Sequence, residues 1–132
     1  MAAHSPQVDG LRGDLLAALN GLQPSAPAIP FYSTVTGRRA DGAELTGAYW
    51  ARNLRAPVRF WEALQALAAD GHTLFVELGP HPTLGVAVAD GLRALGVAGQ
   101  AVGVLRREQT VSEAVLRVVG ALYCAGVAVA WP

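Results

Sequence analysis

Lysine is absent from this chain, and cysteine occurs once. All ten basic residues are arginines, and ten acidic residues balance them to a formal net charge of +0 at pH 7. Because nucleic-acid-binding domains usually carry a basic excess, this balance argues against a nucleic-acid partner. The single Cys124 excludes an internal disulfide framework and a zinc site built from cysteines. Its apolar sequence neighbours predict a buried, unreactive thiol.

Long hydrophobic runs are also missing. No apolar stretch approaches the roughly 18–20 residues that a membrane-spanning helix needs, so we expect no membrane partner. The N-terminus lacks the basic region and apolar run of a signal peptide, so the expected compartment is the cytoplasm. Hydrophobic residues nevertheless make up 52% of the 132 residues, and charged residues only 15%. This composition excludes disorder and predicts about one small domain with a buried core.

The spacing of apolar residues predicts several helices. The first covers about Gln7–Leu22, and a short one follows around Ala48–Leu54. Pro57 and Pro82 each stand at the favoured first position of a further helix. The segment Thr110–Glu113 has the threonine and glutamate of a capping box, which predicts the start of the last helix.

Strand patterns alternate with these helices. Phe31–Thr36 is rich in aromatic and β-branched residues, and the polar stretch Arg38–Thr46 after it is expected to be a loop. Thr73–Leu78 is almost continuously apolar, which is typical of a strand covered on both faces. Ala101–Leu105 is a third strand, which Arg106 and Arg107 are expected to end. The alternation predicts an α/β fold whose short, mainly parallel sheet is flanked by helices and forms part of a larger sheet.

Motifs of catalysis are weak when each is taken alone. The chain has no G-x-S-x-G elbow, no glycine-rich phosphate loop and no H-E-x-x-H pair. The spacing of His4, His72 and His81 does not match that of metal ligands, so no metal site is expected. From these patterns alone the prediction stops at an α/β domain.

Four segments taken in order are more specific. They are His4-Ser5-Pro6, Pro30–Gly37, Tyr49–Phe60 and Phe75–Pro82. Together they resemble the C-terminal half of the acyltransferase domain of modular type I polyketide synthases, which is related to malonyl-CoA:acyl-carrier-protein transacylases. The resemblance covers essentially the whole chain. It implies that residues 1–99 are the C-terminal part of an acyltransferase domain and that residues 100–132 are a post-acyltransferase linker. The implied fold is part of a three-layer, α/β-hydrolase-like large subdomain.

The resemblance also implies a reaction. In this family a serine takes a malonyl-type group from CoA and passes it to the phosphopantetheine thiol of an acyl carrier protein. A histidine serves as general base, because a hydroxyl is a poor nucleophile at neutral pH and imidazole titrates in the useful range. The implied substrate is a malonyl- or methylmalonyl-CoA thioester, and no bound cofactor is expected. The implied partners are the carrier protein, the upstream half of the acyltransferase and the ketosynthase linker.

Individual roles follow from the matched positions. His4 matches the general base; without the family match it reads as a residue of a frayed N-terminal segment. Asn53 matches the residue that orients this imidazole, and a helix-end cap is an equally weighted alternative. Ala3, directly before the base, matches a substrate-contacting position. The motif Gly79-Pro80-His81-Pro82 lies where a strand turns into a helix, and we interpret it as structural rather than catalytic.

The family's nucleophile, its carboxylate-binding arginine and its oxyanion hole have no counterpart in this chain. The chain's serines at positions 5, 25, 33 and 112 all lack the glycine-flanked elbow. We therefore expect a fragment, a reading frame truncated at Met1, or one piece of a split enzyme. The alternative is a non-catalytic remnant or interaction module. The small Ala3 and the segment Pro30–Gly37 favour methylmalonyl over malonyl as the extender unit.

Overall fold

The computed structural model describes residues 2–105 and 108–131. Its contacts divide the chain into two compact units, Met1–Ala69 and Asp70–Pro132. The boundary between acyltransferase domain and linker that is expected at residue 100 falls inside the second unit, and it stays a prediction. The expectations for Met1 and for Arg106 and Arg107 concern residues outside the described ranges.

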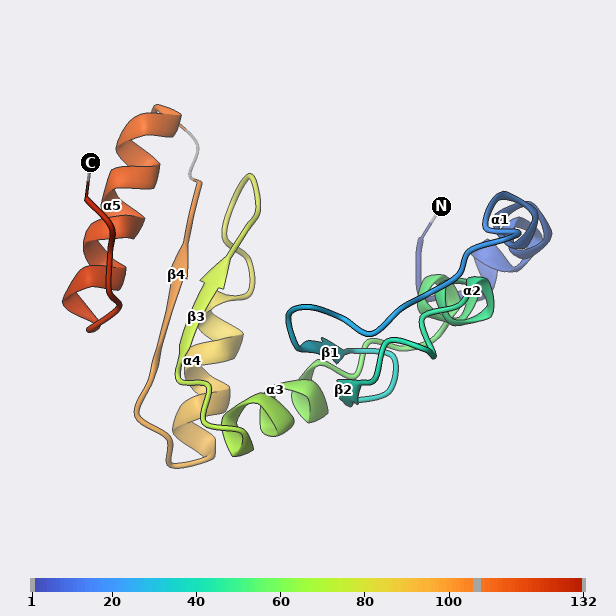
Figure 1. Ribbon diagram of the computed structural model, residues 1–132, viewed down its shortest axis with the longest axis horizontal. Coiled ribbons are helices and arrows are strands. Elements are labelled where there is room, and N and C mark those ends of the chain that lie inside the picture. Colours follow the sequence, from blue (N-terminus) through green and yellow to red (C-terminus); the bar gives the residue numbers. More distant parts are fainter. Residues whose placement is uncertain (1, 106–107, 132) are drawn as a thin grey trace. The chain divides into compact units, whose positions relative to one another are not determined.

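The first unit combines helices with a two-stranded hairpin (Figure 1). Its elements are the 3₁₀ helix η1 (Pro6–Leu11), α1 (Arg12–Ala18), β1 (Phe31–Ser33), β2 (Arg38–Ala40), α2 (Gly47–Arg55) and α3 (Phe60–Ala69). Helices η1 and α1 pack against α2, whereas α3 packs against the hairpin. The prediction of a single helix over Gln7–Leu22 is wrong: this segment forms the 3₁₀ helix η1 followed by α1, which ends at Ala18. Gly10 and Gly13 lie near the junction of η1 and α1, and glycine favours helix interiors least among residues other than proline.

The antiparallel hairpin corrects the prediction of a loop over Arg38–Thr46. Strand β2 pairs with β1 in the register Phe31↔Ala40, although its two arginines give no strand-like pattern. Gly37 makes the turn possible, because its φ is 71° and a Cβ there would lie 2.7 Å from the Cβ of Glu62. The pairing depends on this turn and on main-chain hydrogen bonds, which side-chain patterns do not reveal.

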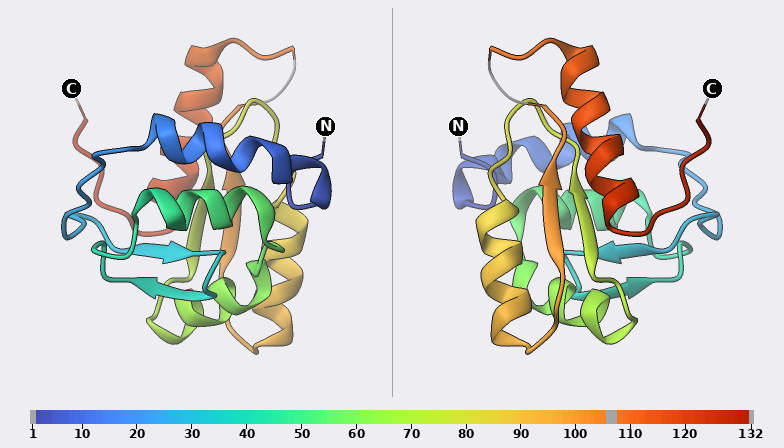
Figure 2. Two further views of the ribbon diagram at one scale, coloured as in Figure 1. Left: turned by 90° about the vertical axis from the view of Figure 1, so that its right-hand side faces the viewer. Right: turned by 90° about the vertical axis from the view of Figure 1, so that its left-hand side faces the viewer.

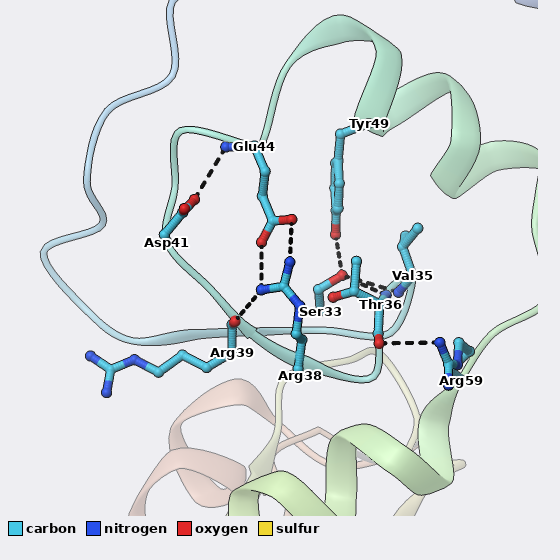
Figure 3. Close-up of polar contacts among 9 residues, drawn as sticks. All are labelled: Ser33, Val35, Thr36, Arg38, Arg39, Asp41, Glu44, Tyr49 and Arg59. Atoms are coloured by element: carbon cyan, nitrogen blue, oxygen red, sulfur yellow. Dashed lines mark hydrogen bonds and ion pairs between the residues drawn. The ribbon is translucent and has the colours of Figure 1, made fainter.

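A buried serine ends β1 earlier than expected and ties the hairpin to α2 (Figure 3). The Ser33 side chain is fully buried, and its oxygen accepts the amide hydrogens of Val35 and Thr36 at 3.1 and 3.2 Å. Because both lone pairs are thus occupied, the Ser33 hydroxyl donates to the Tyr49 hydroxyl oxygen, 2.7 Å away. The two amides are consequently lost to the sheet, and the chain turns after residue 33.

The ends of α2 and α3 also have identifiable causes. The Thr46 hydroxyl accepts the amide of Tyr49 and so caps the start of α2. Helix α3 begins at Phe60 rather than at Pro57: the amide of Ala63 donates to the carbonyl of Arg59 at 3.2 Å, and the amide of Arg59 itself donates to the carbonyl of Thr34 at 2.7 Å. Residues 57–59 therefore lead into the helix without belonging to it.

The second unit contains the parallel strand pair that the sequence predicts (Figure 2). Its elements are β3 (Leu74–Glu77), α4 (Gly85–Ala94), β4 (Gln100–Gly103) and α5 (Val111–Cys124). Strands β3 and β4 pair in the register Leu74↔Gln100, and both α4 and α5 pack against β4. The capping box at the start of α5 is confirmed, with both reciprocal hydrogen bonds of Thr110 and Glu113 present. The α/β fold class is likewise confirmed.

Two expectations for this unit are wrong. Helix α4 begins at Gly85, not at Pro82: the amide of Val88 donates to the carbonyl of Leu84, and the amides of Thr83 and Leu84 before the helix donate to the carboxylate of Glu77. The thiol of Cys124 is exposed rather than buried: Cys124 lies in the last turn of α5, whereas the buried residues of that helix, Ala114 and Val118, lie further toward its start. After α5, residues 127–131 form neither helix nor strand, and the ring of Trp131 lies edge-on to Tyr123 at 5.6 Å. Among the described residues, none of the helices combines the length and apolar character that crossing a lipid bilayer would require.

The buried pair of Ser33 and Tyr49 yields a stability prediction. Tyr49→Phe removes the hydroxyl that is bonded to the buried Ser33 hydroxyl, so the free energy of unfolding should fall by about 1–3 kcal/mol in urea denaturation. Tyr123→Phe is the matched control, because Tyr123 is 58% exposed, and its effect should be close to zero. Equal effects of the two substitutions would contradict the assigned hydrogen bond.

Candidate functional site

His4 is held in an unusual backbone conformation. Its φ is 59°, in the left-handed region, which costs a non-glycine residue on the order of 1 kcal/mol. A local turn surrounds it: the Ser5 hydroxyl donates to the carbonyl of Ala2 at 2.7 Å, and the Ala2 amide donates to Gln7 Oε1 at 2.9 Å. Ser5 also caps η1 by accepting the amide of Gln7. The histidine is thus presented at the start of η1 by a folded segment, and the reading as a frayed terminus does not fit this geometry.

The end of α2 holds His4 through two hydrogen bonds. The backbone amide of His4 donates to the carbonyl of Leu54 at 2.8 Å, and its ring Nδ1 lies 2.7 Å from the carbonyl oxygen of Ala56. Carbonyls at a helix C-terminus lack partners within the helix, so these oxygens are free to accept. Since a carbonyl oxygen can only accept, Nδ1 carries the hydrogen. The neutral ring then has an unprotonated Nε2, which is the atom able to take up a proton.

An ion pair joins the same two segments. Arg55 Nε lies 2.6 Å from Asp9 Oδ1, and Asp9 belongs to η1. Both residues, together with Ala56, line a cavity of about 630 Å³ in the first unit. The remaining lining residues are Arg12, Glu44, Thr46, Ala48, Tyr49, Ala51 and Arg52. The carboxylate of Glu44 is itself engaged by both terminal nitrogens of Arg38, at 2.9 and 3.1 Å (Figure 3). The cavity therefore borders the residue whose carbonyl holds the imidazole.

The sequence also singles out Asn53, Ala3 and the four serines. Asn53 is half-buried in α2, and within the described ranges no hydrogen bond joins it to His4. The carbonyl that meets the imidazole belongs to Ala56, three residues further on, so an orienting role for Asn53 stays a prediction. Ala3 is exposed directly beside His4. Ser5 caps η1, Ser25 and Ser112 are exposed, and Ser33 is buried with its hydroxyl hydrogen-bonded.

The Gly79–Pro82 motif lies in a loop of the second unit that a carboxylate organises. Glu77, the last residue of β3, accepts from the amide of Thr83 at 2.7 Å, from the Thr83 hydroxyl at 3.2 Å and from the amide of Leu84 at 3.0 Å. These donors close the loop over residues 78–82. Hydrogen bonding by the Thr83 amide is the main reason that the pKa of Glu77 lies below its ordinary 4.5; the Leu84 amide acts in the same direction, and desolvation opposes them. His81 is exposed within this loop, and its structural interpretation stays a prediction.

The contacts that hold His4 could not be predicted from side-chain patterns in the sequence. The carbonyls of Leu54 and Ala56 act through the backbone, and any residue has a carbonyl. Asp9 and Arg55 are 46 positions apart, so no spacing rule joins them. No group of three or more histidine, cysteine, aspartate or glutamate side chains able to hold a metal ion occurs in residues 2–105 and 108–131.

Comparison with known proteins places the chain among polyketide synthases. Residues 1–129 match the family described as acyl transferase domain. The spectinabilin polyketide synthase system protein NorA' of Streptomyces orinoci is 46% identical over 130 residues, which are 98% of this chain and 4% of that protein. A mycocerosic acid synthase-like polyketide synthase of Mycolicibacterium smegmatis is 43% identical over 129 residues, or 98% of this chain and 6% of that protein. The chain thus spans a small fraction of these relatives.

Solved structures agree with this assignment. The acyltransferase domain from module 8 of the salinomycin polyketide synthase superposes with a TM-score of 0.91 at 40% identity, over 97% of this chain and 30% of that one. A loading acyltransferase from the avermectin modular polyketide synthase gives a TM-score of 0.84 at 36% identity, over 92% of this chain and 37% of that one. The chain therefore spans about a third of the solved chains it resembles.

The hydrogen bonds to Glu77 predict a pH-dependent loop. Because the folded-state pKa of Glu77 is depressed, its stabilising effect is complete above the unfolded value and is lost as the pH falls through the folded value. The protection factors of the Thr83 and Leu84 amides, which are corrected for the intrinsic pH dependence of exchange, should therefore be high at pH 7 and fall as the pH drops below 4.5. Glu77→Gln should give low protection factors at both pH values, measured by NMR. If exchange were the same in wild type and variant at pH 7, the carboxylate would not organise the loop.

Proposed function

The chain belongs to the acyl transferase domain family of polyketide synthases, and on that premise we propose that it supplies the general base of an extender-unit acyltransferase. The reaction moves a malonyl-type group from CoA to the phosphopantetheine thiol of an acyl carrier protein. His4 is the base. The nucleophilic serine belongs to a part of the domain outside these 132 residues, since none of the chain's own serines has a suitable setting.

The first half-reaction needs one base and one acid. Nε2 of His4 takes the proton of the serine hydroxyl while the serine oxygen forms a bond to the thioester carbonyl carbon. The carbon–sulfur bond then breaks, and the imidazolium returns the proton to the departing CoA sulfur. The products are an acyl-serine and free CoA.

The second half-reaction runs the same exchange with a different thiol. Nε2 takes the proton of the phosphopantetheine thiol, whose sulfur attacks the acyl-serine carbonyl. The ester carbon–oxygen bond breaks, and the serine oxygen recovers the proton from the imidazolium. One imidazole thus alternates between base and acid, which requires that one ring nitrogen stay protonated throughout.

The hydrogen bond between Nδ1 of His4 and the Ala56 carbonyl carries this proposal. It holds the hydrogen on Nδ1 and leaves Nε2 as the proton acceptor, which is the role that an aspartate fulfils in a Ser-His-Asp triad. Once Nε2 is protonated, the same carbonyl oxygen can still accept the hydrogen of Nδ1. The cavity bordered by Ala56 supports a binding site beside this group.

Removal of the base tests the proposal directly. In the complete acyltransferase domain, His4→Ala should lower kcat by about 10²–10⁴-fold with little change in KM for the CoA ester, because a general base acts mainly in the transition state. Asn53→Ala should cost less, since the carbonyl of Ala56 carries the orienting contact. His72→Ala serves as the control histidine substitution.

Rates of extender transfer to the carrier protein provide the measurement. A His4→Ala domain that kept its rate would favour the alternative of a non-catalytic remnant or interaction module. An Asn53→Ala domain as impaired as His4→Ala would assign the Asn53 side chain a direct catalytic role.

We further propose that Ala3 leaves room for a branched extender unit. Its methyl side chain is exposed beside His4, so an α-methyl group on the substrate would meet little there. One methyl group is worth only about 1–3 kcal/mol in such a pocket, so the preference for methylmalonyl-CoA should be modest.

Competition between malonyl-CoA and methylmalonyl-CoA tests the role of Ala3. Ala3→Phe should fill the space of the α-methyl group and shift the product ratio toward malonyl, whereas Ala3→Gly should leave it nearly unchanged. A wild-type preference for malonyl together with an unchanged ratio in Ala3→Phe would refute the steric argument.

A further inference from the structure

Three consecutive residues at the end of α2 contact the segment that carries His4. The carbonyl of Leu54 accepts the His4 amide, the side chain of Arg55 pairs with Asp9, and the carbonyl of Ala56 faces the imidazole. The three distances are 2.8, 2.6 and 2.7 Å. His4 makes two of these contacts, and Asp9, five residues later in the chain, makes the third.

This spacing gives the ion pair a mechanical role. Two hydrogen bonds at His4 fix one point of the segment, and the packing of η1 against α2 restrains the residues after it. The backbone of His4 is in the left-handed region, so relaxation of φ would turn the ring away from Ala56. The helix after it is a single 3₁₀ element, which is weaker than an α-helix. The ion pair at Asp9 adds a polar restraint at the other end of this segment.

We propose that Asp9 and Arg55 are positioning residues for His4, acting through the segment of residues 4–9. The inference rests on the proposed function of His4 as general base. Neither residue needs to touch the reacting atoms. Their pairing keeps η1 against the end of α2, and so keeps Nδ1 on the Ala56 carbonyl and Nε2 available.

The exposure of the pair sets the size and the salt dependence of the effect. The side chains of Arg55 and Asp9 are 45% and 59% exposed. Pairs of this kind contribute modestly and are screened by salt. Loss of the pair should therefore lower the population of the catalytic geometry severalfold, without abolishing it.

Asp9→Asn is the sharpest variant, because it keeps the shape of the side chain and removes its charge. Arg55→Gln is less clean, since Arg12 and Arg52 line the same cavity and offer Asp9 other partners. In the complete domain at low ionic strength, Asp9→Asn should lower kcat about two- to fivefold and leave KM for the CoA ester unchanged. Asp9→Glu, which keeps the charge, should recover most of the lost rate.

The matched control is Asp90→Asn. Asp90 pairs with Arg93 within α4 of the second unit, at the same 2.6 Å, and its side chain is 61% exposed, close to the 59% of Asp9. This control should leave kcat unchanged. In salt of about 1 M, which weakens exposed ion pairs, the difference in kcat between wild type and Asp9→Asn should narrow. The Asp9→Asn/Arg55→Gln double variant should lose no more rate than the more impaired single variant, since both substitutions remove one interaction.

The outcomes separate this inference from the proposed function. If His4→Ala abolishes transfer while Asp9→Asn matches wild type at low salt, the positioning role is refuted and the general base stands. If Asp9→Asn lowers kcat but Asp9→Glu does not recover it, or if salt does not narrow the difference, the effect is not electrostatic positioning and the inference fails. If His4→Ala itself retains the rate, the proposed function fails first.

Discussion

The hydrogen bond from the imidazole of His4 to the carbonyl of Ala56 is the contact on which the site depends. It joins residues 52 positions apart and decides which ring nitrogen can accept a proton. A carboxylate in the same place would bring a full negative charge. A backbone carbonyl brings only a dipole, but its position is set by the helix that precedes it rather than by a flexible side chain.

Contacts elsewhere in the first unit hold α2, and with it the carbonyl of Ala56, in place. Thr46 caps the start of α2, and the buried pair of Ser33 and Tyr49 ties the same helix to the β1–β2 hairpin. At its other end α2 finishes at Arg55, where the carbonyls that find no partner inside the helix accept from His4. The unsatisfied end of a helix is thus used as the orienting group of the proposed base.

Much of the fold could be predicted from sequence because local patterns and packing agree there. The apolar run around Leu74–Glu77, the parallel pairing with β4 and the capping box of Thr110 and Glu113 are examples. Failures occurred where the chain bonds across a distance. Strand β2 has no strand-like pattern, and the amides of Arg59, Thr83 and Leu84, just before α3 and α4, bond groups outside those helices. For the site, the family resemblance makes His4 the candidate base, but no sequence pattern could reveal a carbonyl partner or the pairing of Asp9 with Arg55.

The most direct test is the tautomer of His4. In ¹⁵N-histidine-labelled acyltransferase domain, at a pH where the ring is neutral, the Nδ1 resonance of His4 should have the shift of a protonated nitrogen and Nε2 that of an unprotonated one. The resonances are assigned by their disappearance in His4→Gln. A hydrogen on Nε2, or the averaged shifts of a freely exchanging imidazole, would contradict the proposal that the Ala56 carbonyl prepares His4 as a base.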